Sequence, residues 1–243
     1  PQTVPAAPGR AGARGFDGVG PAGTPPAPFL PLAAAATVTS RIRLGTSIAV
    51  AFARSPMVLA HTGWDLARAS GGRFILGLGV SGPQVVEGWH GVAFGKPLAK
   101  TREYVDIVRM VWRRERPVEH KGEYYQIPYA GPDASGLGKP LRSIIHGDPN
   151  LKIYTAAIAP AGLRTAGEVA DGTLPIFMSP ERAEAIVAPI REGMAKAGAG
   201  KTLADFDLAP YVRISMGEDL AACRDAVRPQ LALYIGGMGA RSK

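Results

Sequence analysis

Short apolar runs alternate along the chain with longer segments in which apolar residues recur every three or four positions. The short runs are typical of buried strands, because they hold four to eight apolar residues and end in small or turn-forming residues. The longer segments are typical of helices, and several begin with a proline or a capping serine. We predict strands over 16–19, 42–50, 74–80, 152–158, 173–177 and 207–215, and helices that begin near 29, 56, 97, 160, 180 and 219.

Each predicted strand is followed by a helix, except across residues 116–150. Repeated strand–helix units of this kind form parallel sheets with right-handed crossovers. A closed (β/α)8 barrel of the TIM type requires eight strands, and we count about six. We therefore predict an α/β fold, an incomplete TIM (β/α)8-type barrel, with an open sheet as the alternative. The segment 116–150 is too long for a bare connection and is interpreted as an insertion over the active face.

Composition and charge narrow the class of protein. The Pro-, Gly- and Ala-rich residues 1–14 favour a disordered leader, and 15–243 have the length and apolar content of one domain. The net charge of +8 is spread without a basic cluster, so we expect no nucleic-acid partner. No segment approaches the ~20 apolar residues of a membrane helix, and the start lacks a signal-peptide core, which predicts a cytoplasmic protein.

Cysteine and histidine usage gives no indication of a metal site. The single cysteine, Cys223, excludes an intrachain disulfide and a multi-cysteine site. His120 and His146 lie in the insertion without acidic or cysteine partners at metal-ligand spacing. We therefore predict no bound metal.

Several motifs carry a family resemblance. They are IRLGTSI from Ile42, SPMVLAHT from Ser55, SGGRFILGLG from Ser70, KTREYV from Lys100, GEYY from Gly122 and GEVADG from Gly167. In this order they resemble the luciferase-like monooxygenase superfamily, and most closely its coenzyme F420-dependent oxidoreductases. The resemblance covers about 16–243. The family's first strand would precede Gly15 and its last would follow Lys243, so we expect a barrel truncated at both ends.

The resemblance implies a cofactor site at the carboxyl ends of the strands. In relatives a non-proline cis peptide bond, which matches Ser47–Ile48 here, presses against the central ring of the deazaflavin. A small-residue segment runs beneath the cofactor, a helix start lies near its phosphate-bearing tail, and a further strand end adjoins it. The matching residues are Gly79, Val80, Ser81 and Gly82 for the first, Ala159 and Pro160 for the second, and Met178 and Ser179 for the third. Without the resemblance, 45–47 would simply close a strand.

His90 is the candidate catalytic residue. It lies in a loop that follows a strand, and an imidazole with a near-neutral pKa is suited to exchange the proton that accompanies hydride transfer. The alternative is a loop histidine that pairs with Glu87 or with backbone. Gly82 stands where sugar-phosphate-oxidising relatives have an acid/base glutamate, which disfavours that substrate class.

The expected function is that of a coenzyme F420-dependent oxidoreductase that transfers hydride between the deazaflavin C5 and a small organic substrate. One alternative is an FMN-dependent monooxygenase that uses reduced flavin and oxygen. Another is an inactive barrel fragment without catalysis. A homodimer is expected by resemblance to relatives, and no membrane partner is expected.

Overall fold

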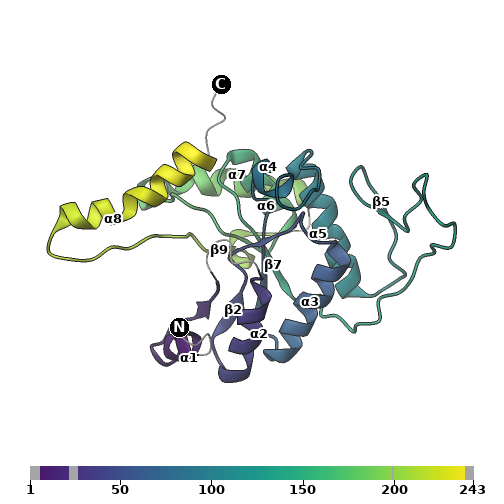
Figure 1. Cartoon of the computed structure of the whole chain (residues 1–243), viewed down its shortest axis with the longest axis horizontal. Helices are drawn as coiled ribbons and strands as arrows, with labels where there is room; N and C mark the ends of the chain where they lie inside the picture. The colour runs from purple at the N-terminus through teal and green to yellow at the C-terminus, as the bar shows by residue number, and fades with distance from the viewer. Residues whose placement is uncertain (1–5, 22–26, 199, 239–243) are drawn as a thin grey trace.

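The protein is built around a parallel sheet that curls into a half-barrel (Figure 1). The computed structural model describes residues 6–21, 27–198 and 200–238. The sheet has seven strands, and every pairing within it is parallel. In spatial order they are β1 (Gly18–Val19), β2 (Arg43–Gly45), β4 (Phe74–Gly79), β7 (Lys152–Thr155), β8 (Gly172–Thr173) and β9 (Asp207–Leu208), and β3 (Ala49–Val50) pairs with β4 as well. This confirms the predicted incomplete barrel.

The predicted strands are present, but several are shorter than expected. The run 42–50 is divided into β2 and β3 by the residues between them, which leave the strand path. The predicted strand 207–215 ends at Leu208, and beyond it a single bridge joins Tyr211 to Ile176. Strand β9 has one neighbour among the described residues, β8, so no second ladder extends it.

All but one of the predicted helices begin within one residue of the predicted start, and the exception is the helix predicted from Pro180, which opens with a 3-10 turn and becomes α-helical at Ala183. They are α2 (Phe29–Val38), α3 (Pro56–Ala69), α5 (Pro97–Arg113), α6 (Pro160–Val169), α7 (Ala183–Ala197) and α8 (Leu220–Ala232). Shorter elements are α4 (Pro83–Val86), the 3-10 turns η1 (Pro180–Arg182) and η2 (Leu203–Asp205), and the π-helical turn η3 (Leu233–Met238). The Ser55 hydroxyl accepts a hydrogen bond from the Val58 amide at 3.2 Å, which caps α3 as expected.

The start of the chain differs from the disordered leader predicted over 1–14. Residues Ala6–Ala13 form a helix, α1, and residues 1–5 lie outside the described part. Ala11 packs against the hydrophobic core, and Arg41 donates a hydrogen bond to the Gly12 carbonyl at 3.0 Å. Tertiary packing therefore orders a segment whose Pro and Gly content favours disorder when it is considered alone.

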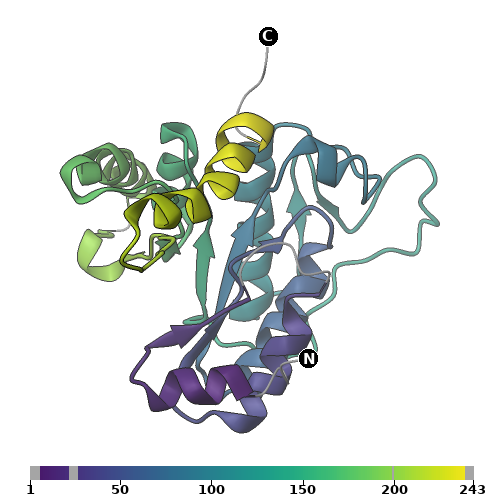
Figure 2. The same ribbon diagram turned by 60° about the vertical axis from the view of Figure 1, so that its left-hand side comes forward.

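The insertion 116–150 carries a small antiparallel hairpin, β5 (His120–Lys121) with β6 (Gln126–Ile127). In both ribbon views the insertion projects from the side of the barrel next to α5 rather than over the sheet (Figures 1 and 2). The Glu103 carboxylate on α5 accepts hydrogen bonds from the amides of Glu123 at 2.9 Å, Tyr124 at 3.0 Å and Tyr125 at 3.0 Å. The motifs KTREYV and GEYY thus form one anchor between α5 and the insertion.

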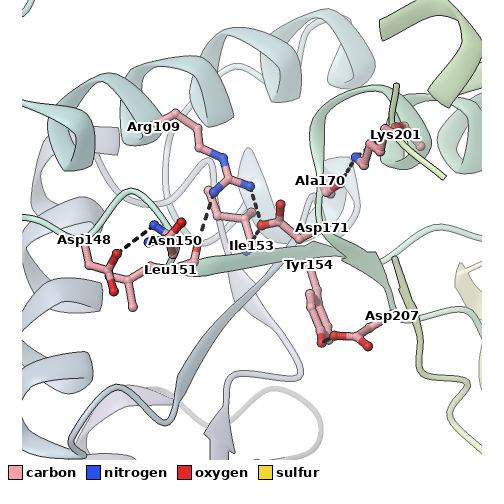
Figure 3. A network of polar contacts seen from close by, with 11 residues as sticks. Arg109, Asp148, Asn150, Leu151, Ile153, Tyr154, Ala170, Asp171, Lys201 and Asp207 are labelled. Carbon is pink, nitrogen blue, oxygen red and sulfur yellow. Dashed lines mark hydrogen bonds and ion pairs between the residues drawn. The ribbon is translucent and has the colours of Figure 1, made fainter. Parts of the chain in front are cut away.

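The main core lies between the sheet and α2, α3 and α5. Trp112 is fully buried, and its indole nitrogen donates to the Ala60 carbonyl at 2.9 Å. At the amino ends of the strands, Asp171 accepts hydrogen bonds from Arg109 and from the Ile153 amide, while Arg109 also donates to the Leu151 carbonyl at 2.9 Å (Figure 3). A polar network therefore ties α5 to β7 and β8 at this end of the sheet, and the small residues lie at the other.

Candidate cofactor site at the carboxyl ends of the strands

Between β2 and β3 the backbone bulges over the inner face of β4. The Thr46 hydroxyl is buried, donates to the Gly77 carbonyl at 2.7 Å and accepts from the Gly77 amide at 2.9 Å. The peptide bond that follows, Ser47–Ile48, is cis, as the resemblance implies. This bulge, residues 46–48, is therefore fixed to the central strand by a side chain that replaces part of the backbone ladder.

Two glycines of β4 make room for the bulge. A Cβ placed on Gly77 would lie 1.8 Å from the Thr46 carbonyl oxygen, which no folded backbone tolerates. A Cβ on Gly79 would lie 2.5 Å from the Ile48 Cδ1 atom. Since residues two apart on a strand face the same side, Gly77 and Gly79 together form a flat inner surface on which the bulge rests. Close backbone approach explains why both positions are glycine.

A cavity of about 430 Å³ lies on the concave side of the sheet. The lining comes from the bulge, from the strands β1, β2, β4, β7 and β9, and from the residues that directly follow β1, β8 and β9. The lining residues are Gly18, Val19, Gly20, Arg43, Gly45, Thr46, Ser47, Ile75, Tyr154, Leu174, Asp207, Leu208 and Ala209. The Tyr154 hydroxyl donates a hydrogen bond to the Asp207 carboxylate (Figure 3). Burial, together with that carboxylate, raises the pKa of Tyr154, so the phenol stays neutral.

The other predicted cofactor residues follow the carboxyl ends of β4, β7 and β8. Gly79 ends β4, and Val80, Ser81 and Gly82 lead into α4. Ala159 and Pro160 begin α6, where no side chain caps the first amides. Met178 and Ser179 follow β8 and lead into η1. Because the strands are parallel, these segments lie at the same end of the sheet. Of all the predicted cofactor residues, Ser47 is the one that lines the cavity of about 430 Å³.

His90 is not joined to this group by any contact that the described residues show. Its side chain is exposed, and it has no hydrogen bond to the described part of the chain. The alternative pairing of His90 with Glu87 is not among the contacts of the described residues, and the Glu87 carboxylate accepts a hydrogen bond from the Phe94 amide at 3.0 Å. The loop is held instead by the buried Lys100, which donates to the Ala93 carbonyl at 2.8 Å.

Lys100 is one of the residues that the sequence did not single out. Its ammonium lies 4.4 Å from the centre of the Phe52 ring, and burial lowers its pKa. Thr46, Gly77, Tyr154 and Asp207 were also not predicted. Gly77 and Gly79 could have been predicted, because two glycines two residues apart in an apolar strand leave one face without side chains. The Tyr154–Asp207 pair could not, because it joins strands that are far apart in sequence.

The described part of the chain shows neither a membrane span nor a metal site. No helix there is long and apolar enough to cross a membrane. No group of three His, Cys, Asp or Glu side chains within 6–21, 27–198 and 200–238 is arranged to hold a metal ion.

Comparison of the sequence with known proteins finds a family and close relatives. The sequence profile of the luciferase-like monooxygenase family matches residues 10–243. A Mycobacterium tuberculosis protein, provisionally named a coenzyme F420-dependent oxidoreductase, is 46% identical over 213 residues. The match takes in 87% of this chain and 61% of the relative. The chain thus spans about six tenths of the length of this curated relative.

Solved structures of similar fold agree with the sequence match. The F420-dependent tetrahydromethanopterin reductase of Methanopyrus kandleri has a TM-score of 0.67 at 28% identity, over 86% of this chain and 60% of that one. An F420-dependent secondary alcohol dehydrogenase in complex with an F420–acetone adduct has a TM-score of 0.80 at 21% identity, over 95% and 70%. The second likeness shows the fold alone. On the family profile and the 46% identical relative, the chain belongs to the luciferase-like monooxygenase family.

Proposed function

We propose that this protein is a coenzyme F420-dependent oxidoreductase that transfers hydride between the deazaflavin C5 and a small organic substrate. The observation that carries the proposal is the seating of the 46–48 bulge on Gly77 and Gly79. This arrangement sets a rigid backbone edge at the carboxyl ends of the strands, beside a cavity of about 430 Å³. Ligand sites are concave and mostly apolar with a few placed polar groups, and this cavity beside the bulge has that character.

The residues at the site fit a deazaflavin with an anionic tail. The first turn of α6 has amides without a side-chain cap, and residues 158–161 are exposed. A helix start of this kind favours a phosphate, because its amides and its dipole both point toward the anion. Ala159 and Pro160 are therefore proposed to hold the tail, while Gly79 to Gly82 and the strand end at Met178 and Ser179 border the ring.

When bound, the deazaflavin supplies a carbon that accepts or donates a hydride. The chain's own contribution is to hold the ring against Ser47–Ile48, to orient the substrate and to exclude water. His90 is the proposed proton-exchanging residue, since it lies in the loop that follows β4 and α4.

The names of the relatives support F420 as the cofactor, because both the 46% identical protein and the Methanopyrus kandleri reductase are described as F420-dependent. The second candidate is an FMN-dependent monooxygenase, which the name of the matching family favours. The two candidate functions require the same fold and differ in the cofactor ring that would lie against the bulge, which is the deazaflavin of F420 in one and the flavin of FMN in the other.

A fluorescence titration with F420, and separately with FMN, distinguishes these candidates. We expect saturable binding of F420 and much weaker binding of FMN. The reverse preference would replace the proposal with the monooxygenase alternative. Binding of neither ligand by a chain that unfolds cooperatively would show that the described half-barrel alone does not hold the cofactor, and would contradict the proposal for this chain.

A further inference from the structure

The loop over residues 87–95 carries His90 and is tied together at its base. The Glu87 carboxylate accepts a hydrogen bond from the Phe94 amide at 3.0 Å, which joins the two ends of the loop. The Val92 amide donates to a carbonyl of α4 at 3.2 Å. His90 itself is exposed. The loop therefore has a closed base and an exposed tip, and its position depends on what the base is attached to.

A buried lysine lies against this base. Lys100 belongs to the first turn of α5 and is only 5% exposed. Its ammonium donates a hydrogen bond to the Ala93 carbonyl at 2.8 Å and lies 4.4 Å from the centre of the Phe52 ring. The rings of Phe52 and Phe94 meet edge to face, with 6.1 Å between their centres. One cation thus contacts both the loop and the aromatic ring on which the loop packs.

Phe52 connects this contact to the bulge. It follows β3, and the amide of the preceding residue, Ala51, donates to the Gly79 carbonyl at 3.0 Å. Gly79 is also the residue against which Ile48 lies. The contacts therefore run without a gap from the 46–48 bulge, through the end of β4 and Phe52, to Lys100 and the loop.

The burial of the Lys100 ammonium is costly to the fold. Within residues 6–21, 27–198 and 200–238 no carboxylate forms an ion pair with it, and burial lowers its pKa. Apolar side chains of similar volume commonly replace buried charged groups without loss of stability. Stability of the core therefore does not explain a cation at this position, whereas its contact with the loop does.

We infer that Lys100 is a positioning residue, whose buried ammonium fixes the 87–95 loop against Phe52 and so places His90 at the carboxyl ends of the strands. The use of His90 in proton exchange rests on the proposed function. The attachment of the loop by Lys100 does not rest on it, because that attachment depends only on contacts within the chain.

Lys100→Met and Lys201→Met form a matched pair of variants, because each removes a buried ammonium and keeps the apolar length of the side chain. The Lys201 ammonium also lies over an aromatic ring, 5.3 Å from the centre of Phe206, and burial lowers its pKa as well. It donates to the carbonyls of Gly167, at 3.1 Å, and Ala170 (Figure 3). These carbonyls end α6 and precede β8, so Lys201 lies at the amino ends of the strands.

Hydrogen exchange measures the attachment of the loop in the chain without added ligand. We expect the Val92 and Phe94 amides to exchange about tenfold faster in Lys100→Met than in the wild-type chain, and at the wild-type rate in Lys201→Met. Thermal unfolding is measured alongside, and we expect Lys100→Met to keep the wild-type midpoint. Unchanged exchange at both amides in Lys100→Met would overturn the inference.

A second variant covers the case in which Lys100→Met does not fold. Lys100→Gln keeps a polar end group but has a shorter side chain without a charge, and the same faster exchange is expected. If neither variant folded, Lys100 would be a residue that the core requires, and the inference would be overturned.

NMR of the chain with ¹⁵N-labelled histidine tests whether Lys100 acts on the site through His90, whose signal is assigned with His90→Gln. We expect saturating F420 to shift the His90 ring signals of the wild-type chain and of Lys201→Met. Most of that shift should be lost in Lys100→Met, although its unfolding midpoint is unchanged. A purely structural lysine would not alter this signature.

The outcomes separate this inference from the proposed function. An equal shift of His90 in the wild-type chain and in Lys100→Met, or F420 binding that leaves the wild-type His90 signals in place, would overturn the inference and leave the cofactor assignment intact. A wild-type chain that does not bind F420, combined with faster loop exchange in Lys100→Met, would support the attachment of the loop by Lys100 and contradict the proposed function.

Discussion

The side chain of Ile48 lies against the backbone of Gly79, so that a Cβ at Gly79 would come within 2.5 Å of Ile48 Cδ1. This contact joins the residue after the cis bond to the last residue of β4. The position of Ile48 therefore depends on the absence of a side chain at residue 79. Because we propose that the deazaflavin ring lies against Ser47–Ile48, the same contact sets the surface on which the ring would rest.

Gly79→Ala is expected to move Ile48 and to weaken F420 binding by about tenfold, or 1.4 kcal/mol. The clash is with the end of a flexible side chain, so the protein should still fold. Ile48→Ala removes the atom that clashes, and the two substitutions together should therefore cost less stability than the sum of their separate costs. Strict additivity in a double-mutant cycle of unfolding free energies would show that the two residues do not interact.

Gly77→Ala should be far more damaging than Gly79→Ala. The added Cβ would meet the Thr46 carbonyl oxygen at 1.8 Å, and only a shift of the bulge backbone relieves this clash. We expect a loss of about 3 kcal/mol in the free energy of unfolding, measured by urea denaturation. Gly9→Ala is the matched control, because a Cβ there meets nothing within 4 Å and the residue lies inside α1, where alanine is favoured. If Gly77→Ala and the control Gly9→Ala lowered the free energy of unfolding equally, the packing described for the bulge would be contradicted.

Asp171→Asn should destabilise the protein by about 2 kcal/mol at neutral pH. The change removes the charge that pairs with Arg109, whose side chain is only 14% exposed, and leaves that guanidinium without a counterion. Glu184→Gln is the control, since its partner Arg191 and the glutamate itself are 54% and 69% exposed, and such pairs contribute little. If thermal denaturation gave the same loss for both variants, the network in Figure 3 would have no special structural role.

Glu103 is expected to make the insertion acid-sensitive. Burial alone would raise its pKa, but the amides of Tyr124, Tyr125 and Glu123, with His120, outweigh burial and lower it below the ordinary value of 4.5. A lowered pKa means that the stabilisation is complete above 4.5 and is lost as the pH falls through the folded-state value. The Glu103→Gln variant should be less stable than the wild-type chain at pH 7. Its free energy of unfolding should also change less with pH in the acid range.

Hydrogen exchange of the Glu123–Tyr125 amides measures this effect locally. We expect faster exchange at pH 7 in Glu103→Gln than in the wild-type chain, because the carboxylate that accepts these amides is gone. Protection that is the same in both proteins would contradict the anchoring role of Glu103.

The sequence predicts the parallel half-barrel well, because the apolar runs at residues 74–79 and 152–155 and the proline-led helix starts are local signals. It also places the cis bond at Ser47–Ile48 through the family resemblance, and the structure has it there. The extent of strands such as β9 is not predictable locally, since it depends on whether a neighbouring strand pairs with it.

Long-range contacts account for the rest of what the sequence missed. The insertion was expected over the active face, yet Glu103 and the hydrogen bond from the Trp64 indole to the His146 carbonyl, at 2.7 Å, hold it beside α5 and α3. The Tyr154–Asp207 pair joins residues 53 positions apart. The spacing of residues along the sequence does not predict any of these contacts, because they join segments that meet only in the folded chain.

The most direct test of the central claim is an isotope-edited NOE experiment on the chain bound to F420, with the isoleucine δ-methyl groups labelled and the Ile48 signal assigned through Ile48→Val. If the bulge supports the cofactor, NOEs will connect ring protons of the deazaflavin to the Ile48 methyl group. If, at saturating F420, the ring protons showed NOEs only to isoleucines outside the bulge and none to Ile48, the proposed site would be contradicted.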